Sequence, residues 1–287
     1  MTMTILQAAI LGLVQGLAEF LPISSSGHLI LARAIMGIAD QAEAPVLQML
    51  DILLHVGTLI AVVVVFWKDW MAILRNLFKS KTLLLLFIAS VPALIVALAF
   101  NDVLESLFAG WFVGFAFLIT AAFMLLAEKL SKRGGKHSKR AEEPGYKHAV
   151  AMGCMQAVAL LPGVSRSGST LLGGVASGLT RTSAAKFSFM MSAPAILGSL
   201  LIKGKNALES GYFQQLDLLP VMVGMVAAAV SGFLAIRFML QVINRISLGW
   251  FALYVAVLGV AVIVLQLAMP GFLQLPAFFG GNVSPIS

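Results

Sequence analysis

Two polar stretches interrupt the apolar regions 5–37 and 148–180 of this 287-residue chain. The first stretch reads EFLPISSSGH, and the second reads LLPGVSRSGST. In each of them a proline, Pro22 or Pro162, breaks an incoming helix, and a serine-rich segment opens the next one. The N-terminus of a helix directs free N–H groups and a positive dipole end at anions. The pattern therefore predicts an anion site, and specifically one for a phosphate or a diphosphate.

Arg166, in the second stretch, is the strongest single indication of function. A charged side chain inside a membrane segment costs about 2.5–3.5 kcal/mol on insertion scales, so a retained one marks a functional site. A guanidinium group can bind two phosphate oxygens at once, which matches the chemistry expected of the serine-rich turns. Arg166 is therefore predicted to bind the anion.

Glu19 lies four residues after Gln15, so the two side chains share one helix face. Beside a phosphate, the carboxylate must be protonated, paired with Arg166 or bridged by a divalent cation. Cations such as Mg²⁺ or Ca²⁺ use carboxylates together with phosphate oxygens, so Glu19 is a candidate metal ligand. A purely structural pair of Glu19 and Arg166 is the alternative.

His28 follows the serine run, three residues after Ser25 and on the same helical face. A histidine at this position can serve as the general base for a serine, or as an acid toward a leaving oxygen. The alternative is a hydrogen-bonded packing residue. Asp51 and His55, four residues apart, form a weaker pair that we expect to support the site or to bind each other.

The composition excludes a water-soluble enzyme, a disordered chain and a coiled coil. Hydrophobic residues make up 60% of the chain, and charged residues make up 11%. Soluble domains carry about 45–50% apolar residues and about 25% charged residues. The net charge of +7 resides in short runs between apolar segments, which indicates membrane topology rather than nucleic-acid binding. The single cysteine, Cys154, excludes an intrachain disulfide.

The apolar segments predict an all-α polytopic membrane protein with six transmembrane helices and two re-entrant helical hairpins. A span needs about 20 residues, and each half of an interrupted region has only about 12–17, which favours re-entrant hairpins at 5–37 and 148–180. The six spans are predicted at about 46–67, 82–100, 111–128, 186–203, 217–240 and 248–269.

The basic residues predict the orientation in the membrane. If the loop 131–147 is cytoplasmic, 15 of the 19 Lys and Arg residues lie on the cytoplasmic side. The positive-inside rule favours this arrangement, which places both termini on the outer face.

An offset of 141 residues aligns the two halves of the chain. It places Ser24, Ser26 and Gly27 on Ser165, Ser167 and Gly168. Each half has one hairpin and three spans, an odd number, so the second repeat must be inverted relative to the first. We therefore divide the single membrane domain into repeat 1 (1–130), a basic loop (131–147), repeat 2 (148–269) and a tail (270–287).

With these motifs the sequence resembles the undecaprenyl pyrophosphate phosphatases, also called bacitracin-resistance proteins. The family's first motif, (Glu/Gln)-x-x-x-Glu, appears as Gln15 to Glu19 and continues as FLPISSSGH. The second, PGxSRSxxT, is matched by Pro162 to Thr170. This sequence carries the glutamine variant of the first motif, with Gln15 at its first position. The variant removes one carboxylate from a metal site that would be built on two glutamates.

The resemblance implies hydrolysis of a C55 isoprenyl diphosphate to its monophosphate in a bacterial plasma membrane, which recycles the lipid carrier for cell-wall synthesis and confers bacitracin resistance. Ser25 would be the nucleophile, His28 its base and later acid, and Arg166 the group that stabilises transition-state charge. Glu19 would hold the cation or orient the base. Direct attack by water, with His28 or Glu19 as the base, is the alternative. The predicted substrate-binding residues are Gln15, Ser24, Ser26, Gly27, Ser165, Ser167, Gly168 and Thr170.

Two other functions compete with a phosphatase. Inverted repeats with broken helices are typical of secondary transporters, so the same site could flip an isoprenyl phosphate or move another anion. A scaffold protein has no use for Glu19, His28 and Arg166 within apolar segments. The expected partners are the isoprenyl diphosphate lipid and the bilayer, without nucleic acid; a homodimer is compatible with the sequence, although no motif indicates one.

Overall fold

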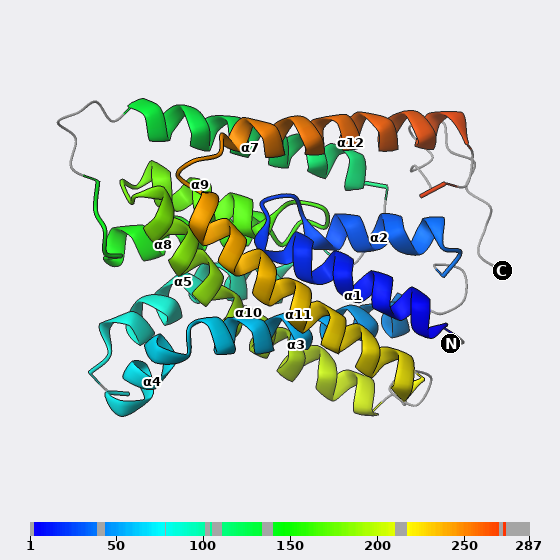
Figure 1. Ribbon diagram of the computed structural model, residues 1–287, viewed down its shortest axis with the longest axis horizontal. Coiled ribbons are helices and arrows are strands. Elements are labelled where there is room, and N and C mark those ends of the chain that lie inside the picture. Colours follow the sequence, from blue (N-terminus) through cyan, green and yellow to red (C-terminus); the bar gives the residue numbers. More distant parts are fainter. Residues whose placement is uncertain are drawn as a thin grey trace.

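The computed structural model describes residues 3–38, 44–77, 79–100, 104, 111–133, 140–209, 217–269 and 272–273. Within these ranges the chain is helical, apart from turns and an isolated β-bridge between Ala141 and Leu179. The helices, shown in Figure 1, are α1 (Ile5–Phe20), α2 (Ser25–Ile35), α3 (Ala44–Val65), α4 (Trp67–Arg75), α5 (Lys81–Ala99), α7 (Val113–Arg133), α8 (Tyr146–Val158), α9 (Arg166–Ala176), α10 (Arg181–Glu209), α11 (Leu218–Val242) and α12 (Leu248–Ala268).

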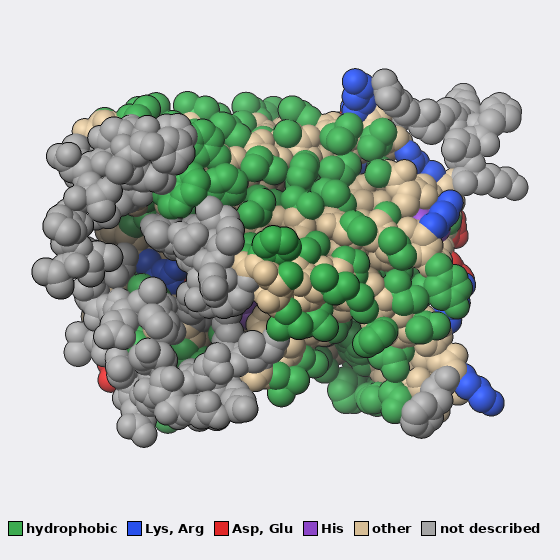
Figure 2. All heavy atoms as spheres, turned by 180° about the vertical axis from the view of Figure 1, so that it is seen from behind, with side chains coloured by type: hydrophobic (Ala, Val, Ile, Leu, Met, Phe, Trp, Pro, Cys, Tyr) green, Lys and Arg blue, Asp and Glu red, His purple; other side chains and the backbone are tan. Residues whose placement is uncertain are grey.

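The long apolar helices confirm the prediction of an all-helical membrane protein. Five of them, α5, α7, α10, α11 and α12, are long and apolar enough to cross a membrane. A sixth span results if the residues from Met49 to Val65 are joined to α4, which is bent away from them by 78°. Hydrophobic side chains cover much of the middle of the face in Figure 2, while most of the visible Lys and Arg side chains gather at one end.

Two shorter helix pairs occupy the predicted hairpin regions. The helices α1 and α2 form one pair, and α8 and α9 form the other. In Figure 1 the two pairs extend from opposite ends of the molecule, and their turns lie near its middle. The predicted serine caps are present, because the Ser24 hydroxyl accepts a hydrogen bond from the Gly27 N–H (3.3 Å) and the Ser165 hydroxyl accepts one from the Gly168 N–H (3.1 Å).

The helix bounds follow the offset found in the sequence. The helix α2 covers Ser25–Ile35, and α9 covers Arg166–Ala176, which is the same range shifted by 141 residues. The pairs α1 and α8, α3 and α10, α5 and α11, and α7 and α12 follow in the same order along the chain. In Figure 1 the start of α1 and the end of α12 lie at one end of the molecule, opposite the end of α7 and the start of α8. The predicted tail 270–287, except 272–273, and residues 134–139 of the predicted loop lie outside the described residues.

Close packing between α1 and α11 holds the first hairpin in place. A Cβ atom added at Gly12 would lie 2.1 Å from the carbonyl oxygen of Gly224, and one added at Gly16 would lie 2.0 Å from the hydroxyl oxygen of Ser231. Small residues four apart allow two helix backbones to approach this closely within a membrane. The face of α1 that carries Gln15 and Glu19 is therefore positioned by its contact with α11.

We expect Gly12→Ala to lower the midpoint of thermal unfolding in detergent, because the added methyl group must displace backbone atoms of α11. Overpacking of this kind destabilises by about 1–3 kcal/mol. Gly198→Ala is the matched control, since a Cβ atom at Gly198 meets nothing within 4 Å. Equal melting temperatures for the two variants would contradict the close approach of α1 and α11.

Candidate functional site

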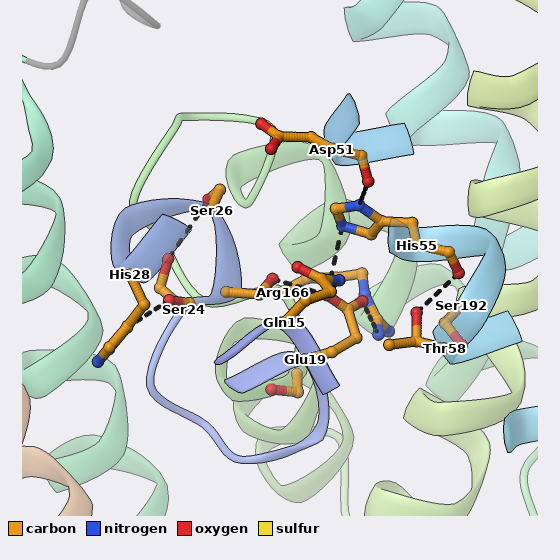
Figure 3. Close-up of polar contacts among 12 residues, drawn as sticks. Gln15, Glu19, Ser24, Ser26, His28, Asp51, His55, Thr58, Arg166 and Ser192 are labelled. Atoms are coloured by element: carbon orange, nitrogen blue, oxygen red, sulfur yellow. Dashed lines mark hydrogen bonds and ion pairs between the residues drawn. The ribbon is translucent and has the colours of Figure 1, made fainter. Parts of the chain in front are cut away.

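The turns of the two hairpins meet at an ion pair between Glu19 and Arg166. Nη2 of Arg166 donates to Oε1 of Glu19 at 2.9 Å, and both side chains are largely buried. Two further hydrogen bonds join the turns, from the Gly163 N–H to the Ser26 hydroxyl (3.1 Å) and from the Ser167 hydroxyl to the Leu21 carbonyl (2.9 Å). The prediction that the two interruptions meet is therefore confirmed (Figure 3).

The second carboxylate oxygen of Glu19 faces several hydrogen-bond donors. Oε2 accepts a hydrogen bond from the Ser25 hydroxyl at 2.6 Å and another from the Gln15 side-chain amide at 3.1 Å. Nε2 of His55 lies 3.4 Å from the same oxygen. Because the Ser25 hydroxyl already points its hydrogen at a carboxylate, that carboxylate is placed to take the proton if Ser25 attacks an electrophile.

Arg166 is the first residue of α9, so its backbone lies at the N-terminus of that helix. Besides its bond to Glu19, the guanidinium donates from Nη1 to the carbonyl oxygen of Ser188 at 2.9 Å. A guanidinium has five N–H donors, so its capacity exceeds these two bonds. An anion at the meeting point of the hairpins can therefore be bound by Arg166 while the pair with Glu19 persists.

His28 has other partners than the predicted one. Its Nδ1 is bonded to the carbonyl oxygen of Ser24 at 2.6 Å, and its Nε2 is 2.8 Å from the Tyr254 hydroxyl on α12. In Figure 3 the ring points away from Glu19 and Arg166. In this structure both ring nitrogens of His28 therefore bind groups other than Ser25, and the Ser25 hydroxyl binds Glu19. A direct action of His28 on Ser25 stays a prediction that these contacts do not support.

His55 lies closer to the centre of the site than its sequence position indicated. Asp51 does not bind it through its carboxylate, which accepts a hydrogen bond from Arg33 at 2.5 Å. Instead, Nδ1 of His55 donates to the backbone carbonyl of Asp51 at 2.6 Å, since a carbonyl oxygen can only accept. The other ring nitrogen therefore faces Glu19 (Figure 3). The spacing of Asp51 and His55 was visible in the sequence, but it did not identify Glu19 as the neighbour of His55.

The remaining predicted residues contact other parts of the protein. The hydroxyl of Thr170 donates to the Arg166 carbonyl at 2.8 Å and lies 2.6 Å from the Ser188 hydroxyl. Oε1 of Gln15 is buried and has no hydrogen-bond partner among the described residues. Ser24 and Ser165 cap α2 and α9, and Ser26 and Ser167 form hydrogen bonds between the two turns. The two glycines lie in close contact with other side chains. A Cβ atom at Gly27 would lie 2.7 Å from the Phe117 ring, and one at Gly168 would lie 3.0 Å from Met124. Their contact with a substrate stays a prediction.

Glu19 is also the residue predicted to hold Mg²⁺ or Ca²⁺. Both of its oxygens face hydrogen-bond donors, namely Arg166 on one side and Ser25 and Gln15 on the other. Among the described residues, no group of three or more His, Cys, Asp and Glu side chains could hold a metal ion. Because hard cations require several oxygen ligands, this donor set does not fit a cation held by the protein alone. The cation stays a prediction.

Comparison with known proteins covers nearly the whole chain. Residues 8–261 match the family described as bacitracin resistance protein BacA. An undecaprenyl-diphosphatase of Carboxydothermus hydrogenoformans is 40% identical over 264 residues, which is 91% of this chain and 97% of the relative. An undecaprenyl-diphosphatase of Halothermothrix orenii is 38% identical over 266 residues, which is 92% of this chain and 98% of the relative. An undecaprenyl-diphosphatase of Christiangramia forsetii is 40% identical over 277 residues, which is 93% of this chain and 100% of the relative.

Proposed function

The chain belongs to the bacitracin resistance protein BacA family, and on that premise we propose that it is a membrane phosphatase that hydrolyses undecaprenyl diphosphate to undecaprenyl phosphate and inorganic phosphate. The names of its relatives support this substrate. The observation that carries the proposal is the hydroxyl of Ser25 bonded at 2.6 Å to the buried carboxylate of Glu19, which is itself paired with Arg166. The activity recycles the lipid carrier for cell-wall synthesis and accounts for bacitracin resistance.

In the proposed reaction the Ser25 oxygen attacks the terminal phosphorus, and the hydroxyl proton passes to Glu19. The bond between that phosphorus and the bridging oxygen breaks, and undecaprenyl phosphate leaves with the electron pair. Water then hydrolyses the phosphoserine, which releases phosphate and restores the Ser25 hydroxyl. Arg166 and the N-termini of α2 and α9 stabilise the charge on the phosphoryl oxygens in both steps. In the alternative, water attacks directly and Glu19 takes its proton.

We further propose that the pairs α1/α2 and α8/α9 are re-entrant hairpins of two inverted repeats. The matching helix bounds and the two half-helix N-termini at one site support this arrangement. The excess of Lys and Arg near the loop 131–147 supports a cytoplasmic loop and outer termini in a bacterial plasma membrane. The isoprenyl chain would lie among the helices, in contact with the bilayer, with the diphosphate reached from the outer face. A homodimer stays a prediction.

A transporter or flippase that uses the same site is the second candidate. Binding an anion for transport requires Arg166 and the helix N-termini, but it gives no role to the hydrogen bond between Ser25 and Glu19. This bond is the reason why we prefer the phosphatase.

We expect Ser25→Ala to lower kcat for phosphate release from an isoprenyl diphosphate by at least about 100-fold, because covalent catalysis loses its nucleophile. The assay uses purified protein in detergent, with and without Mg²⁺ and with a chelator. Ser199→Ala, at an exposed position of α10, is the matched control and should retain the wild-type rate. If Ser25→Ala retains the wild-type kcat, water replaces Ser25 as the nucleophile while the proposed activity stands.

A further inference from the structure

Tyr254 belongs to neither sequence motif, yet its hydroxyl reaches a residue of the first hairpin. The residue lies on α12, and about half of its surface is exposed. Its hydroxyl oxygen is 2.8 Å from Nε2 of His28, and the two rings are stacked, with centroids 5.7 Å apart and planes 18° apart. A phenol within a transmembrane helix requires a hydrogen-bond partner, because an unpaired hydroxyl is costly in hydrocarbon. His28 provides that partner and so links α12 to α2.

The contacts of His28 determine which of its nitrogens carries the hydrogen. Nδ1 is bonded to the carbonyl oxygen of Ser24, which can only accept, so Nδ1 is the donor. In the neutral ring Nε2 is then an acceptor, and the Tyr254 hydroxyl donates to it. The ring of Phe117 packs edge-on against His28, with centroids 5.2 Å apart. The orientation of His28 is therefore set from three sides.

The carbonyl group that His28 holds belongs to a residue with unusual backbone geometry. Ser24 has φ 75° and ψ 101°, a left-handed conformation that a residue with a Cβ atom rarely adopts. Such a conformation persists only where the surroundings enforce it. The next residue is Ser25, whose hydroxyl lies 2.6 Å from Glu19. The backbone of Ser24 thus sets the direction of the proposed nucleophile.

We propose that Tyr254 is a positioning residue: acting through His28, it holds Ser24 in the left-handed conformation that directs the Ser25 hydroxyl at Glu19. This inference rests on the proposed function, because it assigns the contact a role in the chemical step. It also gives His28 a use that does not require contact with Ser25.

The first test is Tyr254→Phe, which removes the hydroxyl and keeps the stacked ring. We expect kcat to fall about 10-fold while KM stays within about 2-fold, because the variant misaligns Ser25 without removing a substrate contact. Tyr146→Phe, at an exposed tyrosine at the start of α8, is the matched control and should match the wild type. An unchanged kcat for Tyr254→Phe, or a rise in KM alone, would overturn the inference.

The second test measures the effect of Tyr254→Phe in a Ser24→Gly background. Glycine adopts positive φ without a penalty, so the backbone at position 24 no longer needs the contact with His28 to keep its left-handed conformation. We expect the loss of kcat caused by Tyr254→Phe to shrink from about 10-fold to below about 2-fold. A loss of the same size in both backgrounds would show that Tyr254 acts by another route.

A third readout does not depend on enzyme activity. In protein labelled with ¹⁵N-histidine, the ring signal that disappears in His28→Gln identifies His28 among the four histidines. The His28 signal should indicate a neutral ring with its hydrogen on Nδ1 in the wild type and a mixture of the two tautomers in Tyr254→Phe. An identical signal in both proteins would refute the proposed coupling. An inactive wild type with the expected shift would refute the proposed function and leave the coupling of Tyr254 to His28 intact.

Discussion

Replacing Arg166 by alanine is expected to lower kcat/KM for hydrolysis of an isoprenyl diphosphate about 1000-fold, by the loss of charge stabilisation in the transition state. The guanidinium is the cation at the meeting point of the hairpins and lies 2.9 Å from Glu19. Its removal takes a charged donor away from the phosphoryl oxygens and the guanidinium partner away from the buried carboxylate. The measurement is the initial rate of phosphate release at several substrate concentrations, together with the melting temperature.

Two further variants separate catalysis from structure. Arg166→Lys keeps the charge but loses the planar fork of donors, so its rate should fall between those of the wild type and Arg166→Ala. Arg237→Ala removes an exposed arginine of α11 that packs over Phe233, and it should retain the wild-type rate. A folded Arg166→Ala protein with a rate within about 10-fold of the wild type would contradict the role assigned to Arg166.

Replacing Glu19 by glutamine should lower kcat about 1000-fold without raising KM. The amide keeps the shape of the side chain, but it cannot take the proton of Ser25 as a carboxylate does, and proton transfer of this kind contributes about 100- to 10000-fold. The substitution also removes a negative charge from the neighbourhood of the diphosphate, so substrate binding should not weaken. The measurement is the separate determination of kcat and KM by phosphate release.

Glu143→Gln is the control for this substitution, since Glu143 is exposed in the segment before α8. It should leave both constants unchanged. A kcat for Glu19→Gln close to the wild-type value, in a protein that melts at the wild-type temperature, would exclude Glu19 as the base.

The start of each inner helix could be predicted because the signal is local. A proline followed by serines and a glycine specifies a break and a cap, and α2 and α9 begin at Ser25 and Arg166 as those patterns indicate. The pairing of Glu19 with Arg166 could also be predicted from the sequence, because two opposite charges within apolar segments are most stable when they lie together. The bend after Val65 was not predicted, because the apolar run continues to Trp67, although the helix direction changes by 78° between α3 and α4.

The partners of the two histidines could not be read from the sequence. Spacing places His28 on the face of Ser25, but its ring is held by Tyr254, which is 226 residues away along the chain. For His55, the i,i+4 spacing from Asp51 left support of the site and mutual binding as alternatives. The His55 ring binds the Asp51 backbone carbonyl, while Arg33 binds the Asp51 carboxylate, and neither contact is specified by the spacing alone. Hydrogen-bond partners on distant helices depend on tertiary packing, which the spacing within one helix does not encode.

The most direct test of the account is phosphate release from undecaprenyl diphosphate by the purified wild-type protein in detergent, compared with Glu19→Gln at equal concentration. We predict release of one phosphate per diphosphate, with undecaprenyl phosphate as the other product, and loss of this release in the variant. A folded wild-type protein that releases no phosphate with Mg²⁺, with Ca²⁺ or without a cation would contradict the proposed hydrolysis. A variant as active as the wild type would contradict the role of the Glu19 carboxylate in it.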